Sequence, residues 1–330
     1  MNDNSFFKKL LPSKDDSPSM RRSKIIAIIS ASVLLISLVI LLCMYINEAR
    51  NRKLNEDLAN LHTTVITSET SISTTAAQEE ETTVTTAPPP PLVELDSMKA
   101  FIEQNPDTAG WIEVPGTYIN NVVVQSGDNE KYLDHNFYGQ KAQPGTIFAD
   151  YRCTVNDYSD NQSDNIVLYG HDQRDGTMFG SLAFYKVKPS SGYTSGFDFY
   201  VNHPTFKFSN LYEEYTYKIV ACFVIETEER HTRDGMIFDY HNFINFGKKR
   251  PYKTFADNIL ERTAINTGVD IEEGDKFMTL STCSNEFEPS RFVVIGRRLR
   301  DGESEDVDTS KATVNYNAKE PDYNFIYSIS

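Results

Sequence analysis

The sequence has little positive charge for its length. Its 330 residues include 32 lysines and arginines against 47 aspartates and glutamates, a formal net charge of −15 at pH 7. Nucleic-acid binding needs a basic face that neutralises phosphates, so this balance argues against DNA or RNA as a partner. There is no glycine-rich phosphate loop and no nucleotide signature. The acidic clusters at residues 226–229 and 272–273 are typical of solvated turns, and we expect no metal and no cofactor.

Cysteine is also scarce, and the four cysteines do not have the spacing of a disulfide framework. Cys43 lies in an apolar run, and Cys222 lies in a strand-like segment where a buried free thiol is the ordinary state. Cys153 follows a probable loop. A bond between Cys153 and Cys222 is compatible with an oxidising compartment, but nothing in the spacing requires it.

One long apolar run stands near the N-terminus. Residues 25–46 carry no charge and are enough to cross a bilayer as one helix. Six basic residues precede the run, which favours a cytoplasmic segment 1–24 and an extracellular remainder. A cleaved signal peptide would have a shorter apolar region and a small-residue cleavage site, and neither is found here. We therefore expect a single-pass membrane protein.

Two segments are expected to stay outside the folded domain. Residues 47–92 are rich in threonine and serine and end in a proline run, which predicts an extended extracellular stalk. Leu54, Leu58 and Leu61 give a weak signal that the helix continues a short way beyond the membrane. The acidic tail, residues 301–330, is expected to be largely disordered, although its aromatic residues 323–326 could dock.

The intervening residues 93–300 have the right length for one domain. Many short β-prone runs with glycine, proline and asparagine between them predict a barrel or a sandwich. Helical patterns occur near residues 95–102, 178–185 and 255–260. The fold class is therefore mainly β with flanking helices.

Chemically distinctive residues follow three of these runs. Cys283 ends the apolar run 277–283, and Arg291 begins the next run. Upstream, the run 165–169 is followed by glycine and then His171. Cysteine can act as a nucleophile, histidine can transfer protons and arginine can stabilise an anion, so together they indicate covalent acyl transfer. A buried structural cysteine and an arginine lying over apolar surface are the alternatives.

The other histidines and arginines are weaker candidates. His171 alone follows a strand-like run and a glycine, whereas the remaining five histidines lie in the stalk or in polar, loop-like segments. Arg297 and Arg298 are expected to face solvent. Asn165, Ser281 and Thr282 could line the site and contact substrate, although hydrogen bonding at strand ends explains them equally well.

These segments resemble the sortase family of cysteine transpeptidases. The most specific signature is T-L-S-T-C at residues 279–283 with Arg291 after it. Residues 105–112, 136–139, 169–179 and the helix-prone insertion 252–266 are similar to class B sortases. The resemblance covers roughly residues 95–299 and implies a closed barrel of about eight strands, with a helix in the insertion before the cysteine strand.

The resemblance also implies roles. Cys283 would be the nucleophile, His171 the acid and base, and Arg291 the group that holds the oxyanion or the substrate backbone. The substrate would be a secreted protein whose C-terminal sorting signal is cut after threonine, and the acceptor an amine of the peptidoglycan cross-bridge. A pilus-assembly sortase using a pilin lysine, a plain cysteine protease, and a surface module that binds sorting peptides without turnover remain alternatives. Class A sortases can bind calcium, but a class B resemblance implies no metal.

Overall fold

The computed structural model describes residues 11–72 and 91–329. The chain divides into two units, residues 1–53 and 54–330, which are described separately. Helix α2 (Pro18–Ile72) begins in the first unit and ends in the second. Its N-terminal half contains an apolar stretch that is long enough to cross a membrane by length and composition.

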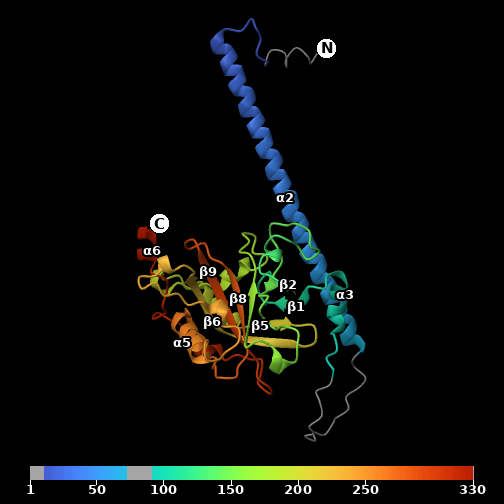
Figure 1. Cartoon of the computed structure of the whole chain (residues 1–330), viewed down its shortest axis with the longest axis vertical. Coiled ribbons are helices and arrows are strands. Elements are labelled where there is room, and N and C mark those ends of the chain that lie inside the picture. Colours follow the sequence, from blue (N-terminus) through green and yellow to red (C-terminus); the bar gives the residue numbers. More distant parts are fainter. Residues whose placement is uncertain (1–10, 73–90, 330) are drawn as a thin grey trace. The chain divides into compact units, whose positions relative to one another are not determined.

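Eight strands of the second unit close into a barrel in the order β1-β2-β3-β4-β8-β9-β6-β5. Figure 1 labels β1, β2, β5, β6, β8 and β9 of this barrel. The expected closed eight-stranded barrel is thereby confirmed. Most neighbours are antiparallel, but β2 and β3, and β4 and β8, pair in parallel. The strands are β1 (Thr108–Glu113), β2 (Asn120–Val124), β3 (Phe148–Ala149), β4 (Asn165–Tyr169), β5 (Thr205–Ser209), β6 (Glu214–Glu226), β8 (Phe277–Cys283) and β9 (Ser290–Arg298).

Helices flank the barrel and fill its connections. They are α3 (Asp96–Gln104), α4 (Ser195–Asn202), α5 (Tyr252–Arg262) and α6 (Tyr323–Ile329). The helix α5 lies in the insertion before β8, as expected. A separate two-stranded sheet joins β7 (Ile265–Asn266) to β10 (Thr313–Val314). The 3₁₀ turns are Lys131–Leu133, Ser159–Asn161, Gly180–Tyr185, Pro189–Ser191, Glu229–His231, Tyr240–Asn242 and Thr309–Lys311.

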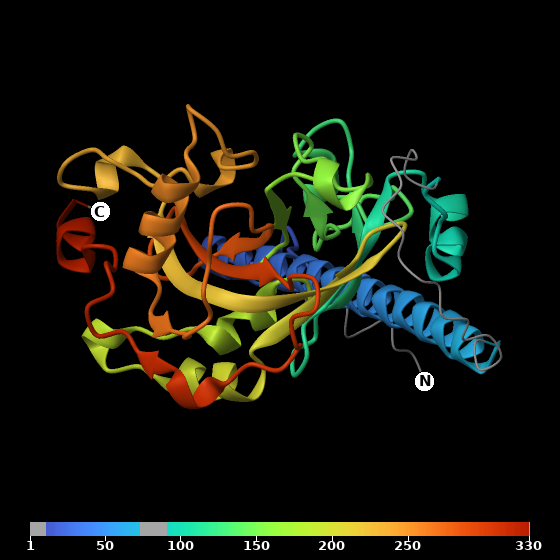
Figure 2. The same ribbon diagram turned by 90° about the horizontal axis from the view of Figure 1, so that it is seen from below.

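The longest strand, β6, bends across the barrel (Figure 2). Its register against β9 shifts between Ile219 and Ala221, and such an irregularity lets a strand curve. Two clusters of buried apolar side chains pack on opposite faces of β9. Phe292 and Val294 belong to the larger one, called the main core cluster here, whereas Val293 and Ile295 belong to the one that includes the buried side chains of α5. This alternation is the two-residue period of a strand that is buried on both faces.

The predicted stalk is partly wrong, because α2 continues as a helix to Ile72. Leu58 is buried with Phe101 of α3 and Trp111 of β1. The His62 ring stacks on Trp111 with centroids 4.1 Å apart. The leucines of the weak pattern thus form an apolar stripe on α2, and this stripe packs against α3 and β1. Residues 73–90, with most of the proline run, lie outside the described residues.

The expectation of a disordered C-terminal tail is also wrong. The tail forms β10 and α6, and Ile326 is fully buried in the main core cluster. Some of its acidic residues have basic partners: Glu303 accepts hydrogen bonds from Arg297 and Lys218, and Asp322 pairs with Arg233. Arg297, which we expected at the surface, is fully buried, and its ion pair with Glu303 compensates the buried charge. Pairing removes the charge repulsion that makes an acidic segment favour disorder.

Candidate active site

Cys283 ends strand β8 at the rim of the barrel. The six preceding residues of β8 are buried, whereas Cys283 is exposed. The side chain of the preceding residue, Thr282, donates a hydrogen bond to the carbonyl of Gly170 (2.8 Å). This bond joins the end of β8 to the segment that follows β4. The thiol therefore lies at a tethered strand end and remains accessible.

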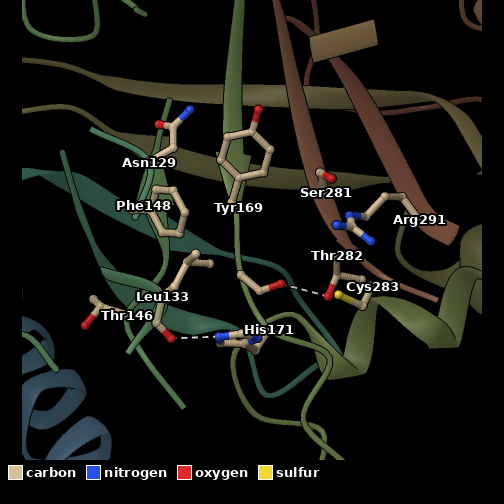
Figure 3. Close-up of a pocket in the computed structure, with 11 residues that line it drawn as sticks. Asn129, Leu133, Thr146, Phe148, Tyr169, His171, Ser281, Thr282, Cys283 and Arg291 are labelled. Atoms are coloured by element: carbon tan, nitrogen blue, oxygen red, sulfur yellow. Dashed lines mark hydrogen bonds between the residues drawn. The ribbon is translucent and has the colours of Figure 1, made fainter. Parts of the chain in front are cut away.

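Arg291 is directly opposite Cys283 in the antiparallel register of β8 and β9. Side chains at such paired positions start from Cβ atoms about 5 Å apart. The guanidinium donates to the carbonyl of Ser290 (3.0 Å) and lies near the Cys283 side chain in Figure 3. A cation beside a thiol favours the thiolate, and the same cation can stabilise an oxyanion.

His171 comes from the other neighbour of β8. Tyr169 pairs with Ser281 in the parallel register of β4 and β8, which brings His171 to the end of β8 that carries Cys283. The His171 Nε2 lies 2.7 Å from the carbonyl oxygen of Leu133 (Figure 3). A carbonyl can only accept, so Nε2 is the protonated nitrogen and donates. The other ring nitrogen, Nδ1, is then the one left for proton exchange.

Cys283, His171 and Arg291 line one pocket of about 160 Å³. Ser281 and Thr282 line it too. The remaining lining residues were not expected from the sequence: Asn129, Leu133, Thr146, Phe148, Tyr169 and Gly170. The pocket is the size of a few side chains, which suits part of an extended peptide rather than a large ligand.

Asn165 does not line this pocket. Its side chain is fully buried, accepts a hydrogen bond from Thr279 (2.8 Å) and donates one to the carbonyl of Phe243 (3.1 Å). Strand-end hydrogen bonding, the alternative interpretation, accounts for this residue. Ser281 combines both roles, because it lines the pocket and its hydroxyl lies 2.7 Å from that of Tyr240.

A buried carboxylate lies behind the pocket. Asp150 is fully buried, and its Oδ2 accepts hydrogen bonds from Asn129 and Tyr169, each 3.0 Å long. Arg152 donates to both of its carboxylate oxygens. Burial on its own would raise the pKa of Asp150, but the bonds from Arg152 outweigh it and lower that pKa. One ionised carboxylate thus orients two pocket side chains.

The remaining cysteines have different environments. Cys153 and Cys222 are buried and free, so the disulfide that the sequence left open is not formed. Burial raises the pKa of Cys153 to about 12 and also raises that of Cys222. Such thiols are poor nucleophiles at neutral pH. Within residues 11–72 and 91–329, no group of three or more His, Cys, Asp or Glu side chains is placed to hold a metal ion.

Comparison with known proteins gives one consistent result. A model of the sortase domain matches residues 112–299. Sortase B of Listeria monocytogenes is 30% identical over 204 residues, which cover 61% of this chain and 74% of that protein. Sortase B of Staphylococcus aureus is 30% identical over 198 residues, which cover 59% of this chain and 72% of that protein.

Solved structures share the fold. A Bacillus anthracis protein described as similar to sortase B has 26% identity and a TM-score of 0.56. The match covers 76% of this chain and 96% of that one. A Staphylococcus aureus sortase B–substrate complex has a TM-score of 0.58 at 23% identity, covering 78% of this chain and all of that one. At 23% identity, the similarity to the Staphylococcus aureus complex shows only that the two proteins share a fold.

Proposed function

The chain belongs to the sortase family of cysteine transpeptidases, and we propose that it is a membrane-anchored sortase B that joins secreted proteins to the cell wall. Its substrate is a protein with a C-terminal sorting signal that is cut after threonine. Its acceptor is an amine of the peptidoglycan cross-bridge. One observation carries this proposal: Cys283, His171 and Arg291 line one pocket from the ends of three adjacent strands.

In the first step, the Cys283 thiol gives its proton to Nδ1 of His171, and the sulfur attacks the threonine carbonyl. The carbonyl oxygen becomes an oxyanion, which Arg291 stabilises from the paired position on β9. His171 then donates a proton to the departing amine as the carbon–nitrogen bond breaks. The products are a thioester on Cys283 and a free C-terminal fragment of the substrate.

In the second step, the acceptor amine attacks the thioester. His171, now neutral, takes a proton from the amine as the new amide bond forms and the carbon–sulfur bond breaks. The thiolate of Cys283 is regenerated. The hydrogen bond from Nε2 to Leu133 holds the ring in one orientation while Nδ1 exchanges protons in both steps.

The apolar part of α2, residues 25–46, is proposed to anchor the enzyme in the membrane. The basic residues before it favour a cytoplasmic N-terminus and an extracellular barrel. This topology puts the active site on the side where sorting signals and cross-bridge amines occur. No nucleic acid, cofactor or metal has a role in this scheme.

The function is tested by incubating the full chain in detergent with a library of sorting peptides and a set of amines. The amines are cross-bridge peptides and a pilin-type lysine peptide, and water competes in every reaction. Mass spectrometry should detect a thioester on Cys283 and a peptide joined to the cross-bridge amine. Cys283→Ala should abolish both products and leave the melting temperature nearly unchanged, since this side chain is exposed.

Other outcomes identify the alternatives. Preferential transfer to the lysine peptide would indicate a pilus-assembly enzyme, and hydrolysis in the presence of every amine would indicate a protease. Peptide binding without a thioester would indicate a module without turnover. A thioester on Cys153 or Cys222 instead would exclude Cys283 as the nucleophile.

A further inference from the structure

The C-terminal helix α6 contacts the loop that joins Cys283 to Arg291. This loop, residues 284–289, connects β8 to β9 and is called the β8–β9 loop here. The Tyr327 hydroxyl donates a hydrogen bond to the carbonyl of Glu286 (2.8 Å). The ring of Tyr323 meets that of Phe287 edge-on with centroids 6.0 Å apart. Both contacts join α6 to the middle of the loop.

A charged group strengthens the same junction. The Glu286 carboxylate pairs with Lys186 (3.1 Å) and with Lys188. The Lys188 ammonium also lies over the Tyr323 ring, 4.6 Å from its centroid. Lys188 therefore contacts the loop and α6 at once. Opposite charges that are partly shielded from water interact more strongly than exposed pairs.

The helix α6 is itself firmly held. Ile326 is fully buried in the main core cluster, and Asp322, just before the helix, pairs with Arg233 (2.7 Å). Upstream, β10 pairs with β7, so the segment is attached at both ends (Figure 2 shows α6 in red beside the C-terminus). This segment lies beyond residues 112–299, the part that the sortase domain model matches.

We propose that α6 is a brace that positions the β8–β9 loop, and through it the spacing between the Cys283 thiol and the Arg291 guanidinium. This inference rests on the proposed function of those two residues. Cys283 is the last residue of β8, and Arg291 is the second of β9. The two residues form the last pair of the β8–β9 ladder, and the loop begins at the residue after Cys283. A shift of the loop would therefore be transmitted to this last pair and to the way its two side chains face the pocket. A displacement of about 1 Å in a reacting group can reduce a rate by about a hundredfold.

Two changes test the brace in the full chain in detergent. Tyr327→Phe removes the hydroxyl that holds Glu286 and keeps the ring, which is largely exposed. A stop after Glu320 removes α6 altogether. Tyr316→Phe is the matched control, because Tyr316 is a more exposed tyrosine of the same tail. Each variant is assayed with a sorting peptide and an amine below its melting temperature.

Tyr327→Phe should lower kcat about threefold, the effect of one neutral hydrogen bond, with KM unchanged. The truncation should lower kcat by about tenfold or more. Tyr316→Phe should match the wild type. A segment that only added stability would lower the melting temperature without changing kcat of the folded protein, and that result would overturn the proposal.

A second measurement does not depend on turnover. Alkylation of Cys283 by iodoacetamide at pH 7, followed by peptide mass spectrometry, should be about threefold slower in the truncated chain because the cation is less well positioned. An unchanged alkylation rate would overturn the brace. If the wild type made no thioester, the proposed function would fail, and the alkylation rates would still decide whether α6 positions the loop.

Discussion

Replacing Leu58 by alanine tests whether the last turns of α2 belong to the folded domain. Leu58 is only 3% exposed and packs with Met98, Phe101 and Trp111. Leucine-to-alanine changes in cores cost about 2–5 kcal/mol of unfolding free energy, and a site between a helix and a barrel surface can partly collapse. We therefore expect a loss of about 2–3 kcal/mol.

For a domain of this size, that loss corresponds to a melting temperature lower by roughly 4–12 °C. The assay is thermal unfolding of a fragment that begins at Leu54, followed by circular dichroism and by fluorescence. The chain has one tryptophan, Trp111, and it stacks on His62, so its emission reports on this junction. Glu56→Ala, an exposed change in the same helix, is the control.

The result that would refute the reasoning is a Leu58→Ala melting temperature equal to that of Glu56→Ala. Residues 54–65 would then not pack on the barrel in solution. A fragment that begins at residue 93 extends the same test, because it lacks all of the α2 contacts with Phe101 and Trp111. It should be less stable than Leu58→Ala, yet it keeps every residue of the pocket.

Three further changes address the chemistry and its support. His171→Gln should reduce turnover by about a hundredfold to ten-thousandfold, the contribution of a general acid–base group, with little change in melting temperature; near-normal turnover would exclude the proton-transfer role. Arg291→Lys keeps the positive charge but loses the planar guanidinium with its several donors, so kcat should fall clearly while the fold is retained. A kcat equal to that of the wild type would show that the guanidinium is not needed. Asp150→Asn leaves Arg152 without its carboxylate and should cost about 1–3 kcal/mol at pH 7. Because the pKa of Asp150 is lowered in the folded state, its stabilisation is present above pH 4 and fades as the pH falls through that lowered value. Melting curves from pH 7 to pH 3 should therefore show the wild type and Asp150→Asn converging in acid, and a constant difference would contradict this assignment.

Much of the barrel, and the residues of the candidate site that follow its strands, could be predicted because the signals are local. An apolar run predicts a strand, and the polar residue after it lies at the strand's end, so Cys283 and His171 could be recognised one segment at a time. The choice of a closed barrel needed the family resemblance, since short strands alone also fit a sandwich. The pairing of β4 with β8 then brings the two strand ends together.

Other parts of the site depend on contacts that no local pattern reveals. Asn129 lies in a polar loop, and its position is set by Asp150, 21 residues away in the chain. The sequence around Asp150 is typical of an exposed loop. The carboxylate is nevertheless buried, because Arg152 and Tyr169 donate hydrogen bonds to its oxygens. Burial of a charge depends on which donors the fold assembles around it, and that information is spread over the whole domain.

The wrong expectations about the stalk and the tail have one physical cause. A polar segment stays disordered when it cannot bury enough apolar surface by itself, and by that test residues 54–72 and 301–329 both fail to fold. A segment that docks on an existing domain has a different requirement, because the partner surface is already formed. Each flanking segment makes few apolar contacts: Leu58 packs on Trp111, and Ile326 enters the main core. Burial of each of these side chains contributes about 1.5–3 kcal/mol of stability, although neither segment forms a separate core. The sparse apolar residues of a polar flank should therefore be judged against the surface they can reach. For α6, that surface includes the main core, which Ile326 enters, and the loop beside Cys283, where Tyr327 donates a hydrogen bond to the carbonyl of Glu286.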